Sequence, residues 1–255
     1  MIEVKNISLI INGGKKILEN ISFTVKKNEH WILLGRNGSG KSKLLEIICG
    51  YTRQSTGEVI RFGDPSPDLR KIRKRIGYVA SYLNTQAAHY HSVINIVLGG
   101  YFGSIGLYDE ITPSLEERAM NLLQLSGLKN FENRLYCTLS DGEKQRVLSA
   151  RAFMVDPEIV IFDEPCSGLD ILSREMLLDS LENVLSSSGA SLIYVTHHVE
   201  EITPLFTHFA LIMNGRFLDS GRLKDEALIN GINRMFDNRV VIEKHAERWY
   251  SRVAG

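Results

Sequence analysis

The chain has 255 residues, and its 30 lysines and arginines balance 30 aspartates and glutamates, so its formal net charge is zero. A chain of this length buries roughly three quarters of the surface of its unfolded state, so it needs neither disulfides nor a structural metal to fold. The charge balance gives no reason to expect nucleic-acid binding, the three cysteines lack the CxxC spacing of a zinc cluster, and no apolar run approaches the ~20 residues of a transmembrane helix.

In chain order, the first part of the sequence consists mainly of short apolar strands. Those at 2–8 and 16–25 are separated by Asn12-Gly13-Gly14, a turn signal that predicts an N-terminal antiparallel β part. Further strands are predicted at 31–34, 57–62 and 76–80, with a helix at 42–49.

The middle of the chain, about residues 86–149, is predominantly helical in its pattern. Apolar residues at helical spacing predict a helix over 114–126, where Ser114 and Glu117 form a capping-box pattern, and a second helix over 142–155. Because this block interrupts two strand-rich parts, it predicts an inserted helical subdomain.

The last part alternates strands and helices again. The expected elements are a strand at 158–162, a helix at 171–187, and strands at 191–195, 209–213 and 216–219. Asn214-Gly215 is a hairpin signal between the last two strands, and residues 223–255 predict a helical, charged tail. Strands alternating with helices favour an α/β fold, a mostly parallel sheet with helices on both faces, whose core is formed by residues 1–85 and 150–222.

The first chemical motif lies between the strand at 31–34 and the helix that follows it. It consists of Gly35, Arg36, Asn37, Gly38, Ser39, Gly40, Lys41 and Ser42. This order of strand, glycine-rich loop and helix is what a phosphate-binding P-loop requires. Backbone N–H groups and the helix N-terminus would surround the phosphates of a nucleoside triphosphate, Lys41 would add a full positive charge, and Ser42 would offer its hydroxyl to Mg²⁺. The motif predicts a P-loop NTPase.

A second motif, Asp163-Glu164, follows the buried-strand pattern of residues 159–162. Ligands of open parallel sheets bind at the C-terminal ends of the strands, so we expect both carboxylates to face the phosphates. Asp163 is suited to hold Mg²⁺, and Glu164 to orient or deprotonate the water that attacks the γ-phosphate. The predicted reaction is Mg²⁺-dependent hydrolysis of a nucleoside triphosphate, which the family resemblance below narrows to ATP.

With these motifs in place, the chain resembles the nucleotide-binding domain of ABC ATPases over about residues 1–222. Residues 139–146 read LSDGEKQR and are similar to that family's signature, usually LSGGQ-x-QR. Ser167-Gly168-Leu169-Asp170 is similar to its D-loop. His197, after the strand at 191–195, stands where the family has its switch histidine.

The resemblance implies a homodimer in which two copies pair head to tail around two ATP molecules. The signature residues, which would contact the ATP held by the other copy, are Ser140, Asp141, Gly142 and Glu143. His197 would reach the γ-phosphate and act with Lys41 and Glu164 in catalysis, and Asp170 would cross the dimer interface. ATP would close the dimer and hydrolysis would release it.

Three positions depart from the family pattern. Ile11 lies where an aromatic residue usually stacks on adenine, so the base contact is weaker and the preference for ATP over GTP stays open. Ser81 stands in place of the usual Q-loop glutamine, so the additional Mg²⁺ ligand is either Ser81 or Gln86. Asp141 and Glu143 replace uncharged signature residues, and a carboxylate near phosphate is unfavourable unless it points away or meets a cation.

The signature variant, the Q-loop without glutamine and the segment 98–108 together resemble a subgroup, the molybdate-transport-like ATP-binding proteins. The resemblance implies the ATPase subunit of an ABC transporter with separate membrane-spanning subunits. The alternative is a soluble ABC ATPase that acts on a protein or nucleoprotein assembly without transport, which Ser81 favours slightly. For the transporter subunit, we expect no direct contact with nucleic acid.

The N-terminal residues MIEVKNISLI contain no basic region followed by an apolar core, so we expect no signal peptide. Cysteines without paired spacing suit a reducing compartment. The expectation is a cytoplasmic protein, peripheral to the inner face of the cell membrane if it has a membrane partner.

Overall fold

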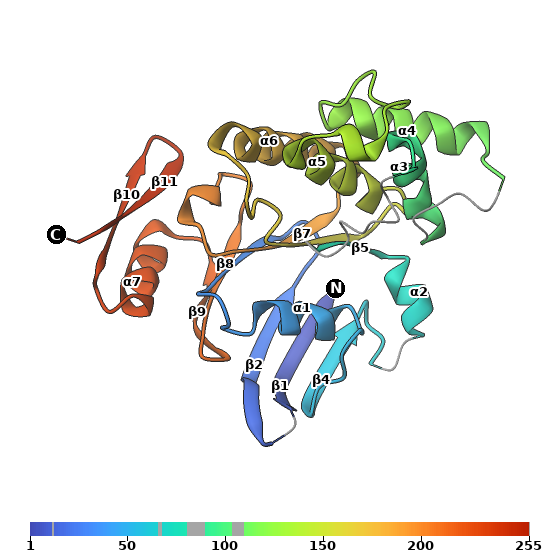
Figure 1. Ribbon diagram of the computed structural model, residues 1–255. Helices are drawn as coiled ribbons and strands as arrows, with labels where there is room; N and C mark the ends of the chain where they lie inside the picture. Colours follow the sequence, from blue (N-terminus) through green and yellow to red (C-terminus); the bar gives the residue numbers. More distant parts are fainter. Residues whose placement is uncertain (12, 66–67, 81–89, 104–109, 255) are drawn as a thin grey trace. The chain divides into compact units, whose positions relative to one another are not determined.

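The computed structural model describes residues 1–11, 13–65, 68–80, 90–103 and 110–254 (Figure 1). The chain forms two compact units, one made of residues 1–73 and 191–255, the other of residues 74–190. The predicted division into a core and a helical subdomain at 86–149 stays a prediction. None of the helices in the described ranges is long and apolar enough to cross a membrane.

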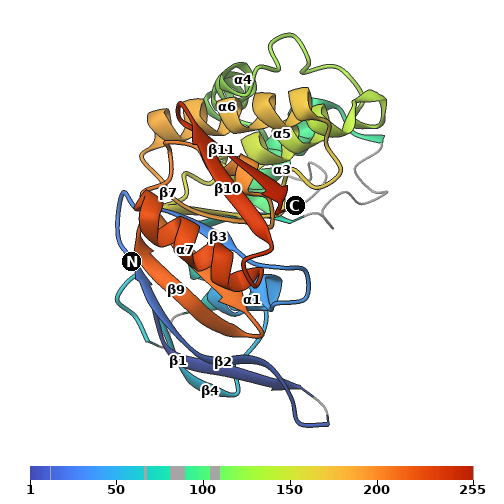
Figure 2. The same ribbon diagram turned by 90° about the vertical axis from the view of Figure 1, so that its left-hand side faces the viewer.

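The first unit contains an antiparallel sheet in the order β2-β1-β4. Its strands are β1 (Ile2–Ile11), β2 (Lys15–Val25) and β4 (Thr56–Arg61), and they lie side by side in Figures 1 and 2. Ile2, Val4, Ile7 and Leu9 of β1 are buried, which is the alternation of a sheet with one face on the core, interrupted by a register shift between Val4 and Ile7. The predicted N-terminal antiparallel part is confirmed.

A second sheet in this unit has the order β7-β3-β8-β9. It consists of β3 (His30–Leu34), β7 (Ser191–Thr196), β8 (His208–Met213) and β9 (Arg216–Arg222). Strand β3 is parallel to both β7 and β8, while β9 is antiparallel to β8. All six residues of β7 are buried, which is typical of a parallel strand covered on both faces.

The hairpin signal between β8 and β9 is confirmed. Asn214 and Gly215 have φ angles of 50° and 75°, the left-handed conformation that both central residues of a tight hairpin turn adopt.

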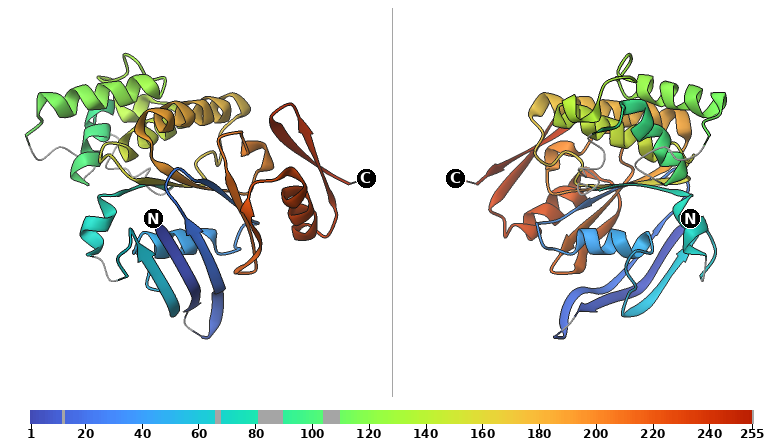
Figure 3. Two further views of the ribbon diagram at one scale, coloured as in Figure 1. Left: turned by 180° about the vertical axis from the view of Figure 1, so that it is seen from behind. Right: turned by 45° about the vertical axis from the view of Figure 1, so that its right-hand side comes forward.

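The helices of the first unit are α1 (Lys41–Ile48), α2 (Leu69–Arg73), the 3₁₀ helix η4 (Val199–Glu201) and α7 (Asp225–Met235). The chain then forms an antiparallel hairpin of β10 (Val240–His245) and β11 (Arg248–Val253), drawn in red beside α7 in Figure 3. The expectation of a wholly helical tail is therefore wrong. Asp237 and Asn238, both at positive φ, end the helix, and the side chains of Ile242 and Trp249 are then buried from opposite strands.

The described residues of the second unit form two parallel strands and four α-helices. The strands are β5 (Ile76–Ala80) and β6 (Ile159–Asp163), and the helices are α3 (Val93–Phe102), α4 (Pro113–Leu125), α5 (Asp141–Ala152) and α6 (Ile171–Ser188), with a 3₁₀ turn η3 (Tyr136–Thr138) before α5. Helix α5 packs against α3, α4 and α6.

Two helix starts differ in how well the sequence predicted them. Ser114 and Glu117 do not form the expected capping box, because α4 begins at Pro113 and the Thr112 hydroxyl accepts the bond from the Leu115 N–H. Proline is favoured at a first helical position, which moves the N-cap two residues upstream, from Ser114 to Thr112. A capping box is instead present at the start of α5, between Ser140 and Glu143.

Candidate functional site

The phosphate loop lies between the end of β3 and the start of α1. Gly40 is the N-cap of α1 and has φ 103°, a conformation that glycine adopts without steric cost. The buried Lys41 side chain folds back, and its Nζ donates to the carbonyl oxygens of Gly35 at 2.6 Å and Arg36 at 3.2 Å. The ammonium group therefore lies inside the curve of the loop, at the N-terminal end of a helix whose dipole also favours an anion.

The loop is held on its other side by the β8–β9 hairpin. The N–H of Gly215 donates to the Ser39 carbonyl at 3.1 Å, and the N–H of Ser39 donates to the Arg36 carbonyl at 3.1 Å. A hollow of about 400 Å³ adjoins the loop and is lined by Arg36, Asn37, Gly38, Ser39, Met213, Asn214, Met235 and Asp237.

His197 lies beside the phosphate loop because of the register between two parallel strands. Leu34, the last residue of β3, pairs with Thr196, the last residue of β7. Gly35 and His197 therefore both follow the paired ends directly, at the C-terminal edge where α/β sheets bind ligands. The His197 ring is half-buried and contacts the His198 ring in a tilted arrangement, with ring centroids 4.0 Å apart and an interplanar angle of 39°.

The acidic pair belongs to the second unit, at the end of β6. Asp163 is buried, and it pairs with Ala80 across the parallel ladder with β5. Glu164 has φ 50°, a left-handed conformation that is uncommon outside glycine. Residues held in such conformations concentrate at functional sites. The two adjacent carboxylates differ in their surroundings, since Asp163 is buried and Glu164 is half-buried.

The signature segment forms the start of α5 in the same unit. The Ser140 hydroxyl accepts from the Glu143 N–H at 3.3 Å, and the Ser140 N–H donates to the Glu143 carboxylate at 2.8 Å. That carboxylate also lies 3.6 Å from Arg134, and Asp141 pairs with Lys144 at 3.1 Å. Both unusual signature acids thus meet a cation, which removes the electrostatic objection to them.

Comparison with known proteins decides the family. The family model described as ABC transporter matches residues 18–167. The uncharacterized ABC transporter ATP-binding protein YlmA of Bacillus subtilis is 38% identical over 97% of this chain and 95% of its own length. The chain belongs to the ABC transporter ATP-binding family.

Other relatives and solved structures agree with this assignment. The ABC transporter ATP-binding protein ModF of Escherichia coli is 32% identical over 80% of this chain and 43% of its own length. The molybdate/tungstate import ATP-binding protein WtpC of Thermococcus kodakarensis is 30% identical over 82% of this chain and 61% of its own length. A dimeric bacterial ABC transporter cassette, MJ0796, superposes with a TM-score of 0.74 at 26% identity, over 88% of this chain and 99% of that one.

These findings confirm the predicted P-loop NTPase fold, ATP binding and the ATPase reaction. A further structure of the MJ0796 cassette holds ADP and phosphate after hydrolysis. The present chain is accordingly an ATP-binding ATPase subunit of the ABC transporter type.

The remaining predicted positions of this ABC ATPase differ in what surrounds them. Asp170 is the N-cap of α6, where its carboxylate accepts from the N–H of Ser173 at 2.8 Å and from its hydroxyl at 3.0 Å. The bond from the Ser173 N–H, and to a smaller extent the bond from the Ser173 hydroxyl, lowers the pKa of Asp170. Ile11 is exposed at the end of β1, and Ser81 and Gln86 lie outside the described residues.

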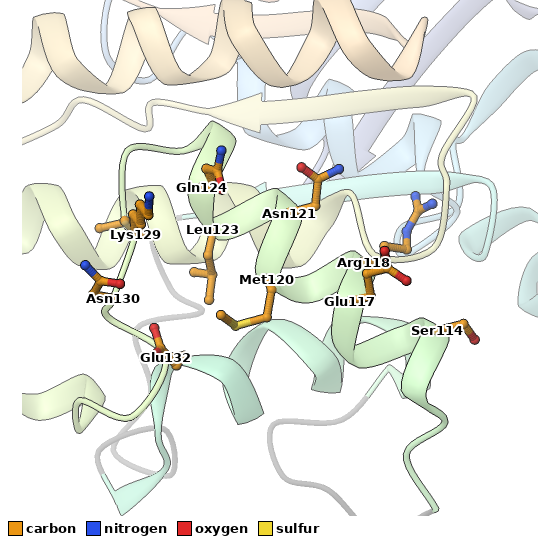
Figure 4. Close-up of a pocket in the computed structure, with 11 residues that line it drawn as sticks. Ser114, Glu117, Arg118, Met120, Asn121, Leu123, Gln124, Lys129, Asn130 and Glu132 are labelled. Atoms are coloured by element: carbon orange, nitrogen blue, oxygen red, sulfur yellow. The ribbon is translucent and has the colours of Figure 1, made fainter.

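A hollow of about 710 Å³ in the second unit lies along α4 (Figure 4) and contains none of the motif residues. Among its lining side chains, Arg118 donates to the Phe153 carbonyl at 2.9 Å and to Asp156 at 3.2 Å. The guanidinium is thus engaged in holding the unit together, and the hollow adds nothing to the phosphate chemistry.

Sequence reasoning missed a set of contacts that surround the His197 segment. Glu201 is buried and accepts from the Tyr194 hydroxyl at 2.7 Å, and Glu200 accepts from Ser251 in β11. The available sequence signal was the strand-forming residues of two short runs, Val240–Ile242 and Trp249–Tyr250, which predict strands but not the segment that the hairpin contacts.

Proposed function

We propose that this subunit works as a homodimer, head to tail around two ATP molecules, and drives membrane-spanning partner subunits at the inner face of the cell membrane. The observation that carries the proposal is the register of β3 and β7, which puts Lys41 and His197 at one sheet edge. The dimeric cassette with a TM-score of 0.74 and 26% identity supports the pairing.

In the proposed reaction, the phosphate loop residues Gly35 to Ser42 bind the phosphates, and Lys41 turns from its carbonyl partners to the outer phosphates. Breaking those two bonds costs little, because a phosphate offers the ammonium group a stronger, charge-assisted partner. Ile11 would contact the base from the exposed end of β1.

Ser42 and Asp163 fit a Mg²⁺ ion by their chemistry, since hydroxyl and carboxylate oxygens are the donors that this ion takes together with phosphate oxygens. Ser81 or Gln86 would add a further oxygen. When bound, the ion would neutralise charge that develops on the phosphates.

Glu164 would orient the attacking water and accept its proton, and His197 would hold the γ-phosphate from the neighbouring strand end. The signature residues Ser140 to Glu143 of the second copy would complete the site with the N-terminus of α5. A helix start favours an anion, and the pairing of Asp141 with Lys144 and of Glu143 with Arg134 supports this role. Asp170 would contact the partner at the interface.

The test replaces Glu164 with Gln and measures ATP turnover, ATP binding and oligomeric state. We expect turnover to fall by ~10²- to 10⁴-fold, the usual contribution of a general base, while ATP binding persists and the ATP-bound dimer accumulates. The matched control is Glu158→Gln, which removes an exposed pair with Arg75 near the other end of β6 and should leave turnover unchanged. Near-normal turnover of Glu164→Gln contradicts the assigned base.

The second candidate is an ABC ATPase that acts without transport, and Ser81 in place of the coupling glutamine favours it. Co-purification from membranes separates the two. A membrane-spanning partner that stimulates ATP turnover supports the transporter subunit, whereas stimulation by a soluble assembly alone supports the alternative.

A further inference from the structure

The C-terminal module, defined as α7 with the β10–β11 hairpin (residues 225–253), contacts two other segments of its own unit. One is the phosphate loop and the other is the turn that follows His197. On one side the Arg36 guanidinium of the phosphate loop lies over the ring of Phe236, 5.9 Å from its centroid, at the end of α7. On the other side β11 packs against η4, the turn that follows His197.

The second contact is a specific pair of hydrogen bonds. Ser251 donates to one carboxylate oxygen of Glu200 twice, from its hydroxyl at 2.8 Å and from its N–H at 3.2 Å. Glu200 follows His197 by three residues. Bonds to an ionised acceptor are about twice as strong as neutral ones, so this pair restrains the backbone just after the histidine.

The element that presents Ser251 is itself held in place. Trp249 is 2% exposed and Ile242 is 9% exposed. Lys244 pairs with Asp225 at the start of α7 at 3.1 Å, and its ammonium lies 5.2 Å from the centroid of the Trp249 ring. The hairpin is therefore anchored by buried apolar side chains and a charge pair, and Ser251 acts from a fixed position.

The His197 segment is correspondingly anchored at both ends. Upstream, the Thr196 hydroxyl at the end of β7 accepts from the His198 N–H at 3.0 Å. Downstream, Glu200 is held by Ser251, and the next residue, Glu201, accepts from Tyr194. Thr196 and Tyr194 belong to the sheet, whereas the Ser251 anchor comes from the tail.

We propose that Glu200 and Ser251 are positioning residues for ATP hydrolysis, through which the C-terminal hairpin fixes the backbone that carries His197. This inference rests on the role of His197 in the proposed function. Misplacing a catalytic group by about 1 Å can lower the rate ~10²-fold, so partial loosening should lower kcat by about 5- to 20-fold. KM for ATP should change little, because the phosphate loop keeps its own contacts.

The experiment uses the full chain and compares Ser251→Ala, Ser251→Thr, Glu200→Ala and Glu200→Gln, with kcat and KM for ATP and Tm as readouts. We expect both alanine variants to lose kcat with KM within about twofold of the parent. Thr and Gln, which keep the hydroxyl and an acceptor oxygen, should recover most of the lost rate. The matched control is Glu243→Ala, which removes the acceptor of the Arg252 side chain within the same hairpin and should keep the parental kcat.

Three results overturn the inference: parental kcat in Ser251→Ala, no recovery in Ser251→Thr, or an equal loss of kcat in Glu243→Ala, which would mean that general loosening of the hairpin lowers the rate. His197→Ala distinguishes this failure from that of the proposed function. If His197→Ala turns over normally, the role of His197 is wrong. If it loses turnover while Ser251→Ala does not, only the positioning role is wrong.

Discussion

Arg61 binds the C-terminal end of α1, the helix whose N-terminal end follows the phosphate loop. Its side chain is 7% exposed and donates to the carbonyl oxygens of Ile48 at 2.7 Å, Ile47 at 2.5 Å and Val59 at 3.2 Å. The first two are terminal carbonyls of α1, at the negative end of its dipole, and the Ile47 carbonyl also accepts from the Gly50 N–H at 3.0 Å. We expect Arg61→Leu to destabilise the fold.

The magnitude follows from these three bonds. A hydrogen bond to a charged group contributes about 1.5–3 kcal/mol, but burial of the guanidinium, which lowers its pKa, offsets part of this. Removing the Arg61 donor from the Ile48 carbonyl at the end of α1 adds to the loss, so the free energy of unfolding should fall by about 3–5 kcal/mol. In chains of roughly 150–250 residues each kcal/mol shifts Tm by about 2–4 °C, which gives a fall of roughly 10 °C.

The assay is thermal unfolding without nucleotide, since a ligand that binds the folded state raises Tm by itself. Arg61→Lys keeps the positive charge but not the planar guanidinium with its several donors, so its Tm should lie between those of the parent and Arg61→Leu. The control is Arg53→Leu, an exposed arginine in the segment before β4, which should change stability by no more than about 0.5 kcal/mol. A Tm for Arg61→Leu within about 2 °C of the parent refutes the reasoning.

Two further predictions concern stability at the start of β3 and in the first turn of α5. Burial lowers the pKa of His30, the first residue of β3, below its ordinary value of 6.5. Below about pH 6.5 the unfolded chain binds a proton that the folded chain resists, so the free energy of unfolding should decrease as the pH falls, and denaturant titrations of His30→Asn should show a weaker decrease. A Cβ added to Gly142 would lie 2.8 Å from the Ser173 Cβ of α6, so Gly142→Ala should lower Tm and the double variant with Ser173→Gly should recover it. No recovery would mean that this contact is not the cause.

The chemistry of this protein was predictable from sequence because it resides in short local motifs. A strand, a glycine-rich loop and a helix place Lys41 by local geometry alone, and a buried strand followed by two acids places Asp163. The cap at Ser140 is equally local, since its partner Glu143 is three residues away. The same reasoning failed at Ser114 because a neighbouring proline favoured a different cap.

What the tertiary structure decided was which distant segments meet. Leu34 pairs with Thr196 only because β7 adds to β3 in a parallel sheet, and this register brings His197 beside the phosphate loop. The tail forms a hairpin, where a helix was expected, because Ile242 and Trp249 are buried there and Ser251 meets Glu200 across 51 residues of sequence. Such pairings depend on strand register and burial between remote parts of the chain, which neither composition nor local spacing encodes.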